Sequence, residues 1–389
     1  MATARKSRIT PDTDSNVNTG ETSQNSSVDY IQKRQQSAPL APWLQNQLET
    51  LLTQRGHAWL LAGASGLGQL DLALALAKTW LCAHPTPQGA CTQCSSCHAI
   101  AVNSHADLRF MVPETLALER GWPLSKKSQK DIETRKPSRE IRVDDAREMV
   151  AYAQVTHARG VILVYPAERM NTVTANAILK TLEEPPSSLF FVLATEATHQ
   201  LLPTIRSRCQ SHAMVWPGFD EALDWLTKSL LTTNTPSDNK AQANSSLPQP
   251  TPAERADLHT LLAAAGGRPA DVHTALLAGL PLHDAAQHWR RLPHAMAEGR
   301  ADALADWTPA QTVAMLQKLC HDLMALRAGG KSRFFDRIDL PDSQPSWSVL
   351  AQWAKALSLS AQTAEHPFSV PLLREAMVSQ AEQVMRLRS

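Results

Sequence analysis

The chain has 389 residues, with 38 Lys and Arg against 37 Asp and Glu, so its formal net charge is +1. Hydrophobic residues make up 43% and charged residues 19%, which excludes a wholly disordered chain and a protein that coats nucleic acid by bulk charge. No stretch approaches the roughly 18 uninterrupted apolar residues of a membrane-spanning helix, and no apolar signal core follows the basic residues near the N-terminus. We therefore expect a cytoplasmic protein with no membrane partner, long enough for two or three domains of about 150 residues.

Three stretches lack the pattern of a folded core. Residues 1–40 include eighteen Ser, Thr, Asn or Gln, a composition that buries too little apolar surface to order, so we expect a disordered tail. Residues 231–252 carry four prolines among polar residues and are predicted to be a flexible linker. Residues 121–140 hold six basic and three acidic residues without apolar periodicity. This stretch predicts a solvated basic insertion, with contact to DNA as the alternative.

Between tail and linker, residues 41–216 alternate short apolar runs with helical patterns. The runs, predicted to be strands, are 58–62, 109–112, 161–165 and 190–194. The third begins with four consecutive apolar residues, as in a strand covered on both faces. Before the fourth, Ala175, Ile178 and Leu182 lie on one helical face, which two prolines end. Strands that alternate with helices predict a parallel, three-layer α/β domain.

After residue 216 the strand signal fades and helical faces follow one another. Leu258, Leu261 and Leu262 begin one such face, and similar spacings recur from Leu316 and from Leu350. We therefore expect a small helical domain over 217–280, which contains the predicted linker, and a separate helical domain over 281–389.

Residues 63–70 (GASGLGQL) follow the first apolar run and precede a helical pattern, which is the context of a nucleotide-binding P-loop, G-x-x-x-x-G-K-[ST]. Gly63 and Gly68 occupy the glycine positions. Gln69 replaces the lysine that would reach the β- and γ-phosphates, and Leu70 replaces the hydroxyl that would hold Mg²⁺. The sequence thus indicates a degenerate P-loop, the alternative being an ordinary Gly-rich turn.

The other half of an ATPase site is also missing from the sequence. Such a site needs an apolar strand that ends in an Asp for the metal, and then a Glu that polarises water. Here Val161–Val164 is followed by Tyr165 and Pro166, and Glu168 comes late. We therefore expect a nucleotide-site scaffold that binds no cofactor at the loop and does not hydrolyse ATP.

Four of the six cysteines, Cys82, Cys91, Cys94 and Cys97, have the spacing C-x8-C-x2-C-x2-C. Four thiolates suit a closed, tetrahedral, structural Zn²⁺ site, because no ligand position is left for water. An iron–sulfur cluster is the competing interpretation, since four thiolates also hold such clusters. His98 is an alternative fourth ligand.

Further matches in the same region resemble the clamp-loader subunits of bacterial DNA polymerase III. Residues 176–186 (NAILKTLEEPP) resemble the family's N-A-L-L-K-T-L-E-E-P-P helix, and residues 207–209 match its S-R-C motif. Residues 141–148 (IRVDDARE) resemble the segment that precedes the family's acidic strand. With the degenerate P-loop, these matches fall in the family's order across residues 42–216.

The resemblance implies an AAA+, P-loop NTPase-like α/β domain with a parallel sheet, carrying a zinc module at 82–97 and the insertion at 121–140. A helical lid domain (217–280) and an all-α collar or oligomerisation domain (281–389) are implied to follow. The implied cofactor is a structural Zn²⁺. The implied partners are the gamma/tau and delta subunits in a hetero-pentamer and, through that complex, the sliding clamp and primer-template DNA.

Two types of subunit in this family share the motifs. The gamma/tau type keeps an intact P-loop and an acidic strand end; the other type has lost both, and this chain is similar to it. The resemblance therefore implies a non-hydrolysing subunit of a DNA-directed DNA polymerase holoenzyme, not an enzyme on its own, that helps load the sliding clamp during replication. The alternatives are an active gamma/tau-like ATPase and a zinc-dependent nucleic-acid-binding protein.

The resemblance also gives Arg208, between Ser207 and Cys209, a function. In the family this arginine projects into the ATP site of a neighbouring subunit as an arginine finger in trans. A guanidinium near the γ-phosphate offsets charge that develops in the transition state; the alternative is a surface ion pair. Thr195 aligns with a sensor position of the family, and Arg268 is either a second sensor arginine or a structural helix cap.

Overall fold

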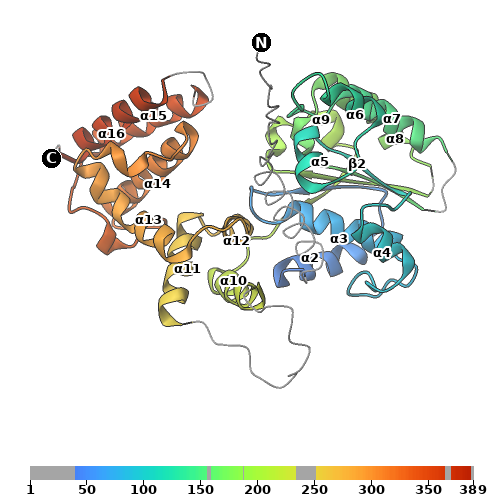
Figure 1. Ribbon diagram of the computed structural model, residues 1–389, viewed down its shortest axis with the longest axis horizontal. Helices are drawn as coiled ribbons and strands as arrows, with labels where there is room; N and C mark the ends of the chain where they lie inside the picture. The colour runs from blue at the N-terminus through green and yellow to red at the C-terminus, as the bar shows by residue number, and fades with distance from the viewer. Residues whose placement is uncertain (1–39, 156–158, 187, 234–250, 364–368, 387–389) are drawn as a thin grey trace, which may run out of the picture.

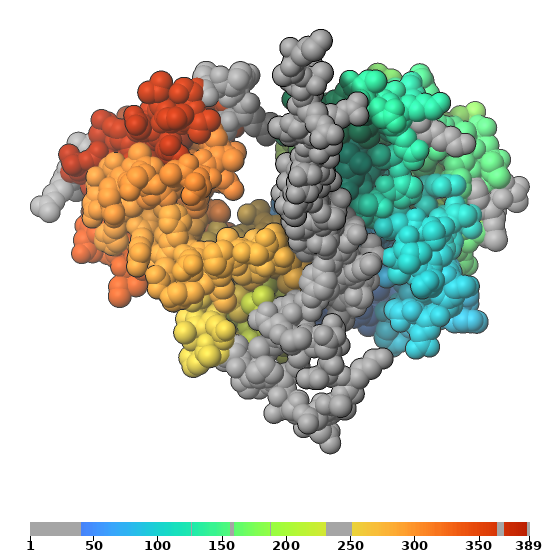
Figure 2. Space-filling model, viewed as in Figure 1, coloured from blue at the N-terminus to red at the C-terminus, as the bar shows by residue number. Residues whose placement is uncertain are grey.

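The computed structural model describes residues 40–155, 159–186, 188–233, 251–363 and 369–386. Residues 1–39 of the predicted tail and 234–250 of the predicted linker lie outside these ranges, and the ends of the linker stretch belong to helices that finish at residue 233 and start at residue 252. In the described part of the chain, an α/β domain on one side of the view and a group of C-terminal helices on the other are bridged by α10, α11 and α12 (Figure 1). The same two lobes stand at opposite sides of the surface view (Figure 2).

The α/β domain is built on five parallel strands. In spatial order they are β2 (Leu108–Met111), β3 (Gly160–Val164), β4 (Leu189–Thr195), β1 (Ala58–Ala62) and β5 (Gln210–Ala213). The first four match the apolar runs to within one residue at each end. The sequence did not predict β5, because this edge strand reads Gln-Ser-His-Ala and leaves its side chains largely exposed.

Helices cover both faces of the sheet. On one face lies α3 (Gln69–Leu81), with α2 (Pro42–Leu52) packed beside it, and on the other lie α7 (Val143–Ala153) and α8 (Thr172–Glu183). Alternate residues of β3 belong to the two cores: Val161 and Leu163 pack with α3, and Ile162 and Val164 with α7 and α8. The expectation of a strand buried on both faces is therefore confirmed.

Shorter elements complete this domain. They are α4 (Ser95–Ala101), α5 (Glu114–Arg120), α6 (Lys126–Ile132), α9 (Pro203–Arg206) and the 3-10 turns η1 (Ala167–Arg169) and η2 (Thr198–Gln200). The helix α6 lies within the predicted insertion, where the sequence shows no apolar periodicity. It begins at Ser125, whose side chain accepts a hydrogen bond from the Ser128 N–H and so caps the helix.

Beyond residue 216 all described elements are helical. The helices α10 (Phe219–Thr233), α11 (Pro252–Ala264) and α12 (Pro269–Leu277) share one small core. A larger core unites α13 (Leu282–Ala297), η3 (Ala301–Leu304), α14 (Pro309–Arg327), α15 (Trp347–Thr363) and α16 (Val370–Arg386), with η4 (Arg337–Asp339) packed against α13. The separation into two cores supports the predicted division near residue 280, which stays a prediction.

A parallel five-stranded α/β domain with a cysteine cluster, followed by helical regions, confirms the predicted parallel α/β fold class with all-helical regions after it. Among the described residues, none of the helices combines the length and the apolar character that crossing a bilayer requires.

Candidate functional site

The P-loop-like segment connects β1 to α3 at the carboxyl end of the sheet. Gly66 and Gly68 have φ values of +78° and +92°, a conformation that favours glycine. A Cβ on Gly63 would lie 2.6 Å from the Cβ of Met214, so this position also needs glycine. The loop thus keeps the backbone requirements of a P-loop even though its polar side chains differ.

The two side chains that stand in place of the P-loop lysine and hydroxyl have structural contacts. The Gln69 side chain is buried, and its Nε2 donates a hydrogen bond to the Ala64 carbonyl 2.6 Å away. Leu70 is buried in the core between α2, α3 and the sheet. At these two positions, therefore, neither a cation nor a hydroxyl is directed toward a phosphate.

A carboxylate from α12 lies directly against the loop. A Cβ on Gly66 would lie 2.6 Å from Asp271 Oδ1 and 2.9 Å from the Cβ of Arg268. Arg268 Nε is 3.1 Å from Asp271 Oδ2 and donates to the Ala265 carbonyl at 2.7 Å. Burial raises the pKa of Asp271, Arg268 opposes that shift, and Glu196 adds to it. Arg268 is thus paired within its own chain, but as the N-cap residue of α12 it makes no side-chain cap hydrogen bond, and its role stays a prediction.

The pH dependence of unfolding is expected to carry a contribution from Lys318 on α14. Its Nζ donates to the Ala264 carbonyl at 2.7 Å, and burial, reinforced by Arg268, lowers its pKa from 10.5 to about 8. Between these values the unfolded chain binds a proton that the folded chain has released, so the free energy of unfolding rises with pH. Below the folded pKa both states are protonated and the slope from this group vanishes.

This effect can be measured by urea unfolding at about pH 8 and about pH 10, close to the folded and unfolded pKa values of Lys318. Lys318→Met should show a smaller rise in stability over this interval than the unsubstituted chain. Equal rises in the two proteins would contradict the prediction.

The end of β3 carries a hydrogen-bonded network where an ATPase would place its metal ligand. The Tyr165 hydroxyl donates to Glu196 Oε1 at 2.7 Å, and burial raises its pKa, so it remains a neutral donor. Glu168 accepts from the Thr195 hydroxyl at 2.7 Å and from the Glu196 N–H at 3.1 Å. The late Glu168 and the sensor-position Thr195 are therefore engaged with each other.

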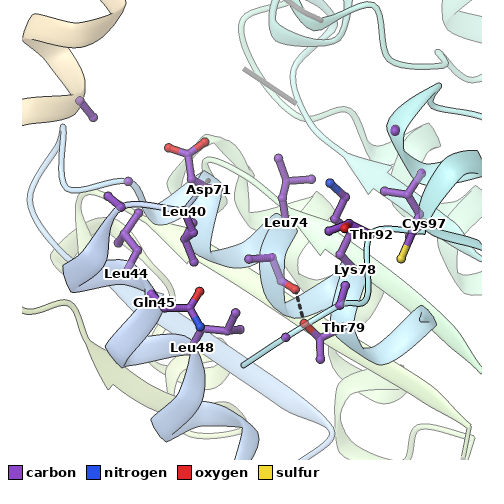
Figure 3. Close-up of a pocket in the computed structure, with 18 of the residues that line it drawn as sticks. Leu40, Leu44, Gln45, Leu48, Asp71, Leu74, Lys78, Thr79, Thr92 and Cys97 are labelled. Atoms are coloured by element: carbon purple, nitrogen blue, oxygen red, sulfur yellow. Dashed lines mark hydrogen bonds between the residues drawn. The ribbon is translucent and has the colours of Figure 1, made fainter. Parts of the chain in front are cut away.

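A cavity of 680 Å³ adjoins the loop on the side of α2 and the cysteine cluster (Figure 3). Leu44 and Leu48 of α2 face Leu74 of α3 across it, and Asp71 and Lys78 add charge from α3. It reaches the P-loop-like segment at Leu67 and Gly68 and is continuous with that site.

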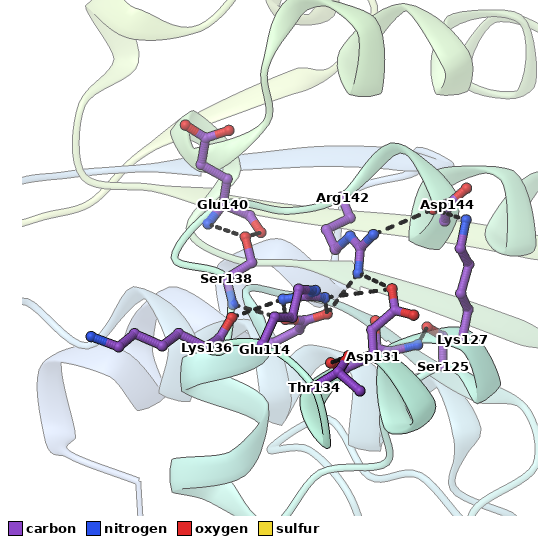
Figure 4. A network of polar contacts seen from close by, with 12 residues as sticks. Glu114, Ser125, Lys127, Asp131, Thr134, Lys136, Ser138, Glu140, Arg142 and Asp144 are labelled. Atoms are coloured by element: carbon purple, nitrogen blue, oxygen red, sulfur yellow. Dashed lines mark hydrogen bonds and ion pairs between the residues drawn. The ribbon is translucent and has the colours of Figure 1, made fainter.

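The predicted basic insertion is tied to the domain by a buried carboxylate (Figure 4). Glu114, only 1% exposed, accepts from Arg135 Nη2 at 2.6 Å, from Arg142 Nη1 at 3.2 Å and from the Ser138 N–H at 2.8 Å. Lys127 pairs with Asp144 at 2.8 Å. Part of the positive charge counted in the sequence is therefore neutralised within the domain.

Arg208 follows the one-turn helix α9, and its backbone is fixed from both sides. Its N–H donates to the carbonyl of Ile205, which is fully buried, and the next residue, Cys209, is buried in the core. Burial raises the pKa of Cys209 to about 12, so its thiol stays neutral and packs as an apolar group. The S-R-C motif thus anchors an arginine whose side chain is 31% exposed.

Arg208 lies at the opposite edge of the sheet from its own P-loop. All five strands are parallel, so their carboxyl ends share one edge, where Gly63, Tyr165 and Thr195 lie. Arg208 lies two residues before Gln210, the first residue of β5. Gln210 pairs with Trp59, near the start of β1. Four residues of strand, about 13 Å at 3.3 Å per residue, separate the two edges. This arginine therefore does not serve the loop of its own chain.

The four predicted metal ligands come together. Their Sγ atoms all lie within 4.8 Å of one another, and Cys82 Sγ is 3.4, 3.8 and 3.6 Å from those of Cys91, Cys94 and Cys97. Thiolates about 2.3 Å from one Zn²⁺ in a tetrahedron would lie about 3.8 Å apart. The four Sγ atoms are therefore spaced for a single ion, and they lie too close together to surround an iron–sulfur cluster with several irons. In the described part of the chain, the set of potential ligands at this site does not include His98.

Local structure explains how the sequence gathers these thiols. Cys82 is the residue that ends α3, and Cys94 is the N-cap of α4, where its Sγ accepts from the Cys97 N–H at 3.5 Å. Thr92 has a φ of +60°, which turns the chain between Cys91 and Cys94. The two helix ends supply three ligands and the turn brings the fourth.

Comparison with known proteins identifies relatives of this region. The family model described as "DNA polymerase III, delta subunit" matches residues 39–215. The DNA polymerase III subunit delta' of Pseudomonas aeruginosa is 36% identical over 198 residues, which cover 50% of this chain and 54% of that protein. The Escherichia coli subunit delta' is 32% identical over 198 residues, or 49% and 53% of the two chains.

The gamma/tau subunit of Mycobacterium tuberculosis is also similar, with 34% identity over 155 residues, 39% of this chain and 23% of that protein. The chain spans about half the length of the curated delta' relatives that it matches. The residues that the family model matches, 39–215, are those of the α/β domain.

Proposed function

Because residues 39–215 match the family model described as "DNA polymerase III, delta subunit", and the chain is similar to subunit delta', we propose that it is a clamp-loader subunit of that family that does not hydrolyse ATP itself. It acts in the cytoplasm in a hetero-pentamer with gamma/tau and delta subunits. Through that complex it helps to load the sliding clamp onto primer-template DNA.

The lining of the P-loop-like segment supports the absence of ATP hydrolysis in cis. A triphosphate needs cations and a Mg²⁺ ligand. The loop presents Gln69 turned back on its own backbone, the buried Leu70 and the carboxylate of Asp271. The Asp271 carboxylate, paired with Arg268, takes up the space against Gly66, beside the position at which a lysine would otherwise attract a phosphate.

A gamma/tau-like ATPase is the second candidate, favoured by the 34% identity to that subunit. Equilibrium binding of ATP to the chain distinguishes the two candidates. We expect no binding that depends on residues 63–70; ATP binding that is lost when Gly68→Ala blocks the loop would support the ATPase instead.

Arg208 is the residue through which the subunit contributes to catalysis in our proposal. The observation that carries it is the position of Arg208 at the amino edge of the sheet, anchored but exposed, away from its own loop. An arginine so placed is available to the site of a neighbouring subunit, where it would stabilise charge on the transferred γ-phosphate.

Replacing Arg208 with Ala is expected to lower ATP hydrolysis by the reconstituted complex, measured with clamp and primed DNA. The site that Arg208 enters should lose about 10³ in rate, as when an arginine finger is removed, and with sites that turn over together we expect hydrolysis by the whole complex to fall about tenfold. Assembly of the complex, measured by its mass, should be unchanged. Undiminished hydrolysis in an intact complex would refute the assignment of Arg208.

A structural Zn²⁺ completes the proposal. Cys82, Cys91, Cys94 and Cys97 would hold it, and with four thiolate ligands it would stabilise the connection between α3 and α4 without binding water. The spacing of the Sγ atoms supports this assignment.

A further inference from the structure

The guanidinium of Arg208 is held by a carboxylate from another element of the fold. Glu183, the last residue of α8, accepts a hydrogen bond from Arg208 Nε at 2.5 Å, and Arg208 Nη2 contacts the same oxygen, Oε1. On its other side, Nη1 donates to the carbonyl of Thr204 at 2.9 Å. The side chain is therefore fixed in direction by α8 and by α9.

These contacts leave the outer end of the guanidinium, between Nη1 and Nη2, with one long hydrogen bond that a phosphate can replace. Arginine has five N–H groups in a planar fork. The edge formed by Nε and Nη2 meets Glu183, and one N–H of Nη1 meets Thr204. At the end of the fork, Nη1 makes a second, longer hydrogen bond of 3.4 Å to Ser207 Oγ, and no further contact to the outer N–H of Nη2 is found among the described residues. Two parallel N–H groups at the end of the fork are the arrangement that binds a phosphate in bidentate fashion.

Glu183 is poorly placed for the stability of its own helix. The C-terminus of a helix carries partial negative charge, so a carboxylate in the last turn is unfavourable. Here Glu183 ends α8 and Glu184 follows as the C-cap. The positive charge of Arg208 offsets that repulsion only at Glu183. The pairing thus explains Glu183 and does not explain the exposed Glu184, which makes Glu184 a control of equal charge at the adjacent position.

We infer that Glu183 is a positioning residue, which holds Arg208 so that the open end of its guanidinium is presented to the ATP site of the neighbouring subunit. This inference rests on the proposed role of Arg208. An unpaired arginine at this exposed position would sample many rotamers and would lose that freedom when it binds the phosphate. Because Glu183 uses the Nε edge, the ion pair can persist while the phosphate takes the other edge.

The test compares Glu183→Ala with Glu184→Ala in the complex reconstituted with gamma/tau and delta subunits, clamp and primed DNA. We expect Glu183→Ala to lower kcat for ATP about threefold to fivefold with little change in KM, because the contact is made only in the transition state. Glu184→Ala should leave both constants unchanged. The mass of the complex shows whether each variant assembles, and the midpoint of unfolding of each variant shows whether it folds normally.

The double variant Arg208→Ala/Glu183→Ala decides whether Glu183 acts through the arginine. If it does, the double variant hydrolyses ATP no more slowly than Arg208→Ala alone. A further fall, a Glu183→Ala rate equal to that of Glu184→Ala, or a rate above the unsubstituted complex would each overturn the inference while leaving the finger in place. A normal rate for Arg208→Ala would overturn both proposals.

Discussion

Replacing Arg135 with Met is expected to lower the free energy of unfolding by about 3 kcal/mol, because it leaves a buried carboxylate without its main partner. Glu114 is 1% exposed, and both Nη atoms of Arg135 bond to it, at 2.8 and 2.6 Å. The arginine itself is 33% exposed and could turn to water. The carboxylate of Glu114 cannot, so losing the cation costs more than losing a surface ion pair.

The matched control is Arg147→Met. Arg147 pairs with Asp144 at 3.5 Å on the surface, with 70% of its side chain exposed. Exposed pairs of this kind contribute about 0–1 kcal/mol. Urea unfolding of the two variants should therefore separate them, and hydrogen exchange should show faster opening of α5 and α6 in Arg135→Met. Equal losses of stability in the two variants would contradict the assigned role of Glu114.

Acid should weaken the same network. Burial alone would raise the pKa of Glu114, but Arg135, the Ser138 N–H, Ser128 and Arg142 outweigh it and hold the pKa at about 2, below the usual 4.5. For a carboxylate with a lowered folded pKa, the stabilisation is fully present above 4.5 and is lost as pH falls toward 2. Glu114→Gln should therefore be less stable than the unsubstituted chain at about pH 7. The difference in the free energy of unfolding should shrink toward pH 3, by no more than about 1.4 kcal/mol for each unit of pH.

The sequence predicted the parts of the fold that have a local signal. The strand β3 is a run of apolar residues because it is covered on both faces, so its composition alone reveals it. The strand β5 is polar because it lies at an exposed edge, and what defines it is pairing with β1, about 150 residues earlier in the chain. Nothing in its own four residues encodes that partner.

The cysteine cluster was predictable for the same reason as β3. Its four ligands lie within sixteen residues, and the two C-x2-C steps are themselves turn geometry. The Glu114 network is the opposite case. Its arginines lie 21 and 28 residues from the carboxylate, so no periodicity links them, and residues 121–140 appeared as an unstructured basic stretch.

The two charged contacts at the candidate sites were also beyond sequence reasoning. Asp271 meets Gly66 only because α12 folds back over the loop. Glu183 and Arg208 each lie in a motif that the sequence does display, yet the spacing of 25 residues carries no sign that they pair. Motifs identified the residues, and the fold supplied the direction in which each side chain acts.

Replacing Cys94 with Ser is expected to abolish stoichiometric zinc binding and to unfold the segment from Cys82 to Cys97. Loss of a ligand should exceed the about 10- to 100-fold fall in affinity that follows loss of an outer-shell partner. Serine is itself a preferred N-cap, so its hydroxyl oxygen can accept the Cys97 N–H as the Cys94 Sγ does, and the variant tests the metal rather than the cap. Zinc per chain, measured by elemental analysis of the native protein, should fall from one to zero.

The unfolding should stay local, because the core of α3 does not depend on the metal. Leu72 and Leu76 of α3 are fully buried against the sheet, whereas the cysteine segment contacts α3 through its thiols and through Ser96, whose hydroxyl donates to the Leu81 carbonyl at 2.5 Å. Protease should therefore cut between Cys82 and Cys94 in Cys94→Ser or in chelator-treated protein, while the β-sheet signal persists.

Cys320→Ser is the matched control, since this thiol is buried among the C-terminal helices and lies outside the cysteine cluster. It should retain one zinc per chain. Acid should also release the metal, because zinc binds thiolates and protons compete for them. A Cys94→Ser protein that keeps its zinc, or that loses it and resists protease as the unsubstituted chain does, would show that the cluster does not hold a structural ion.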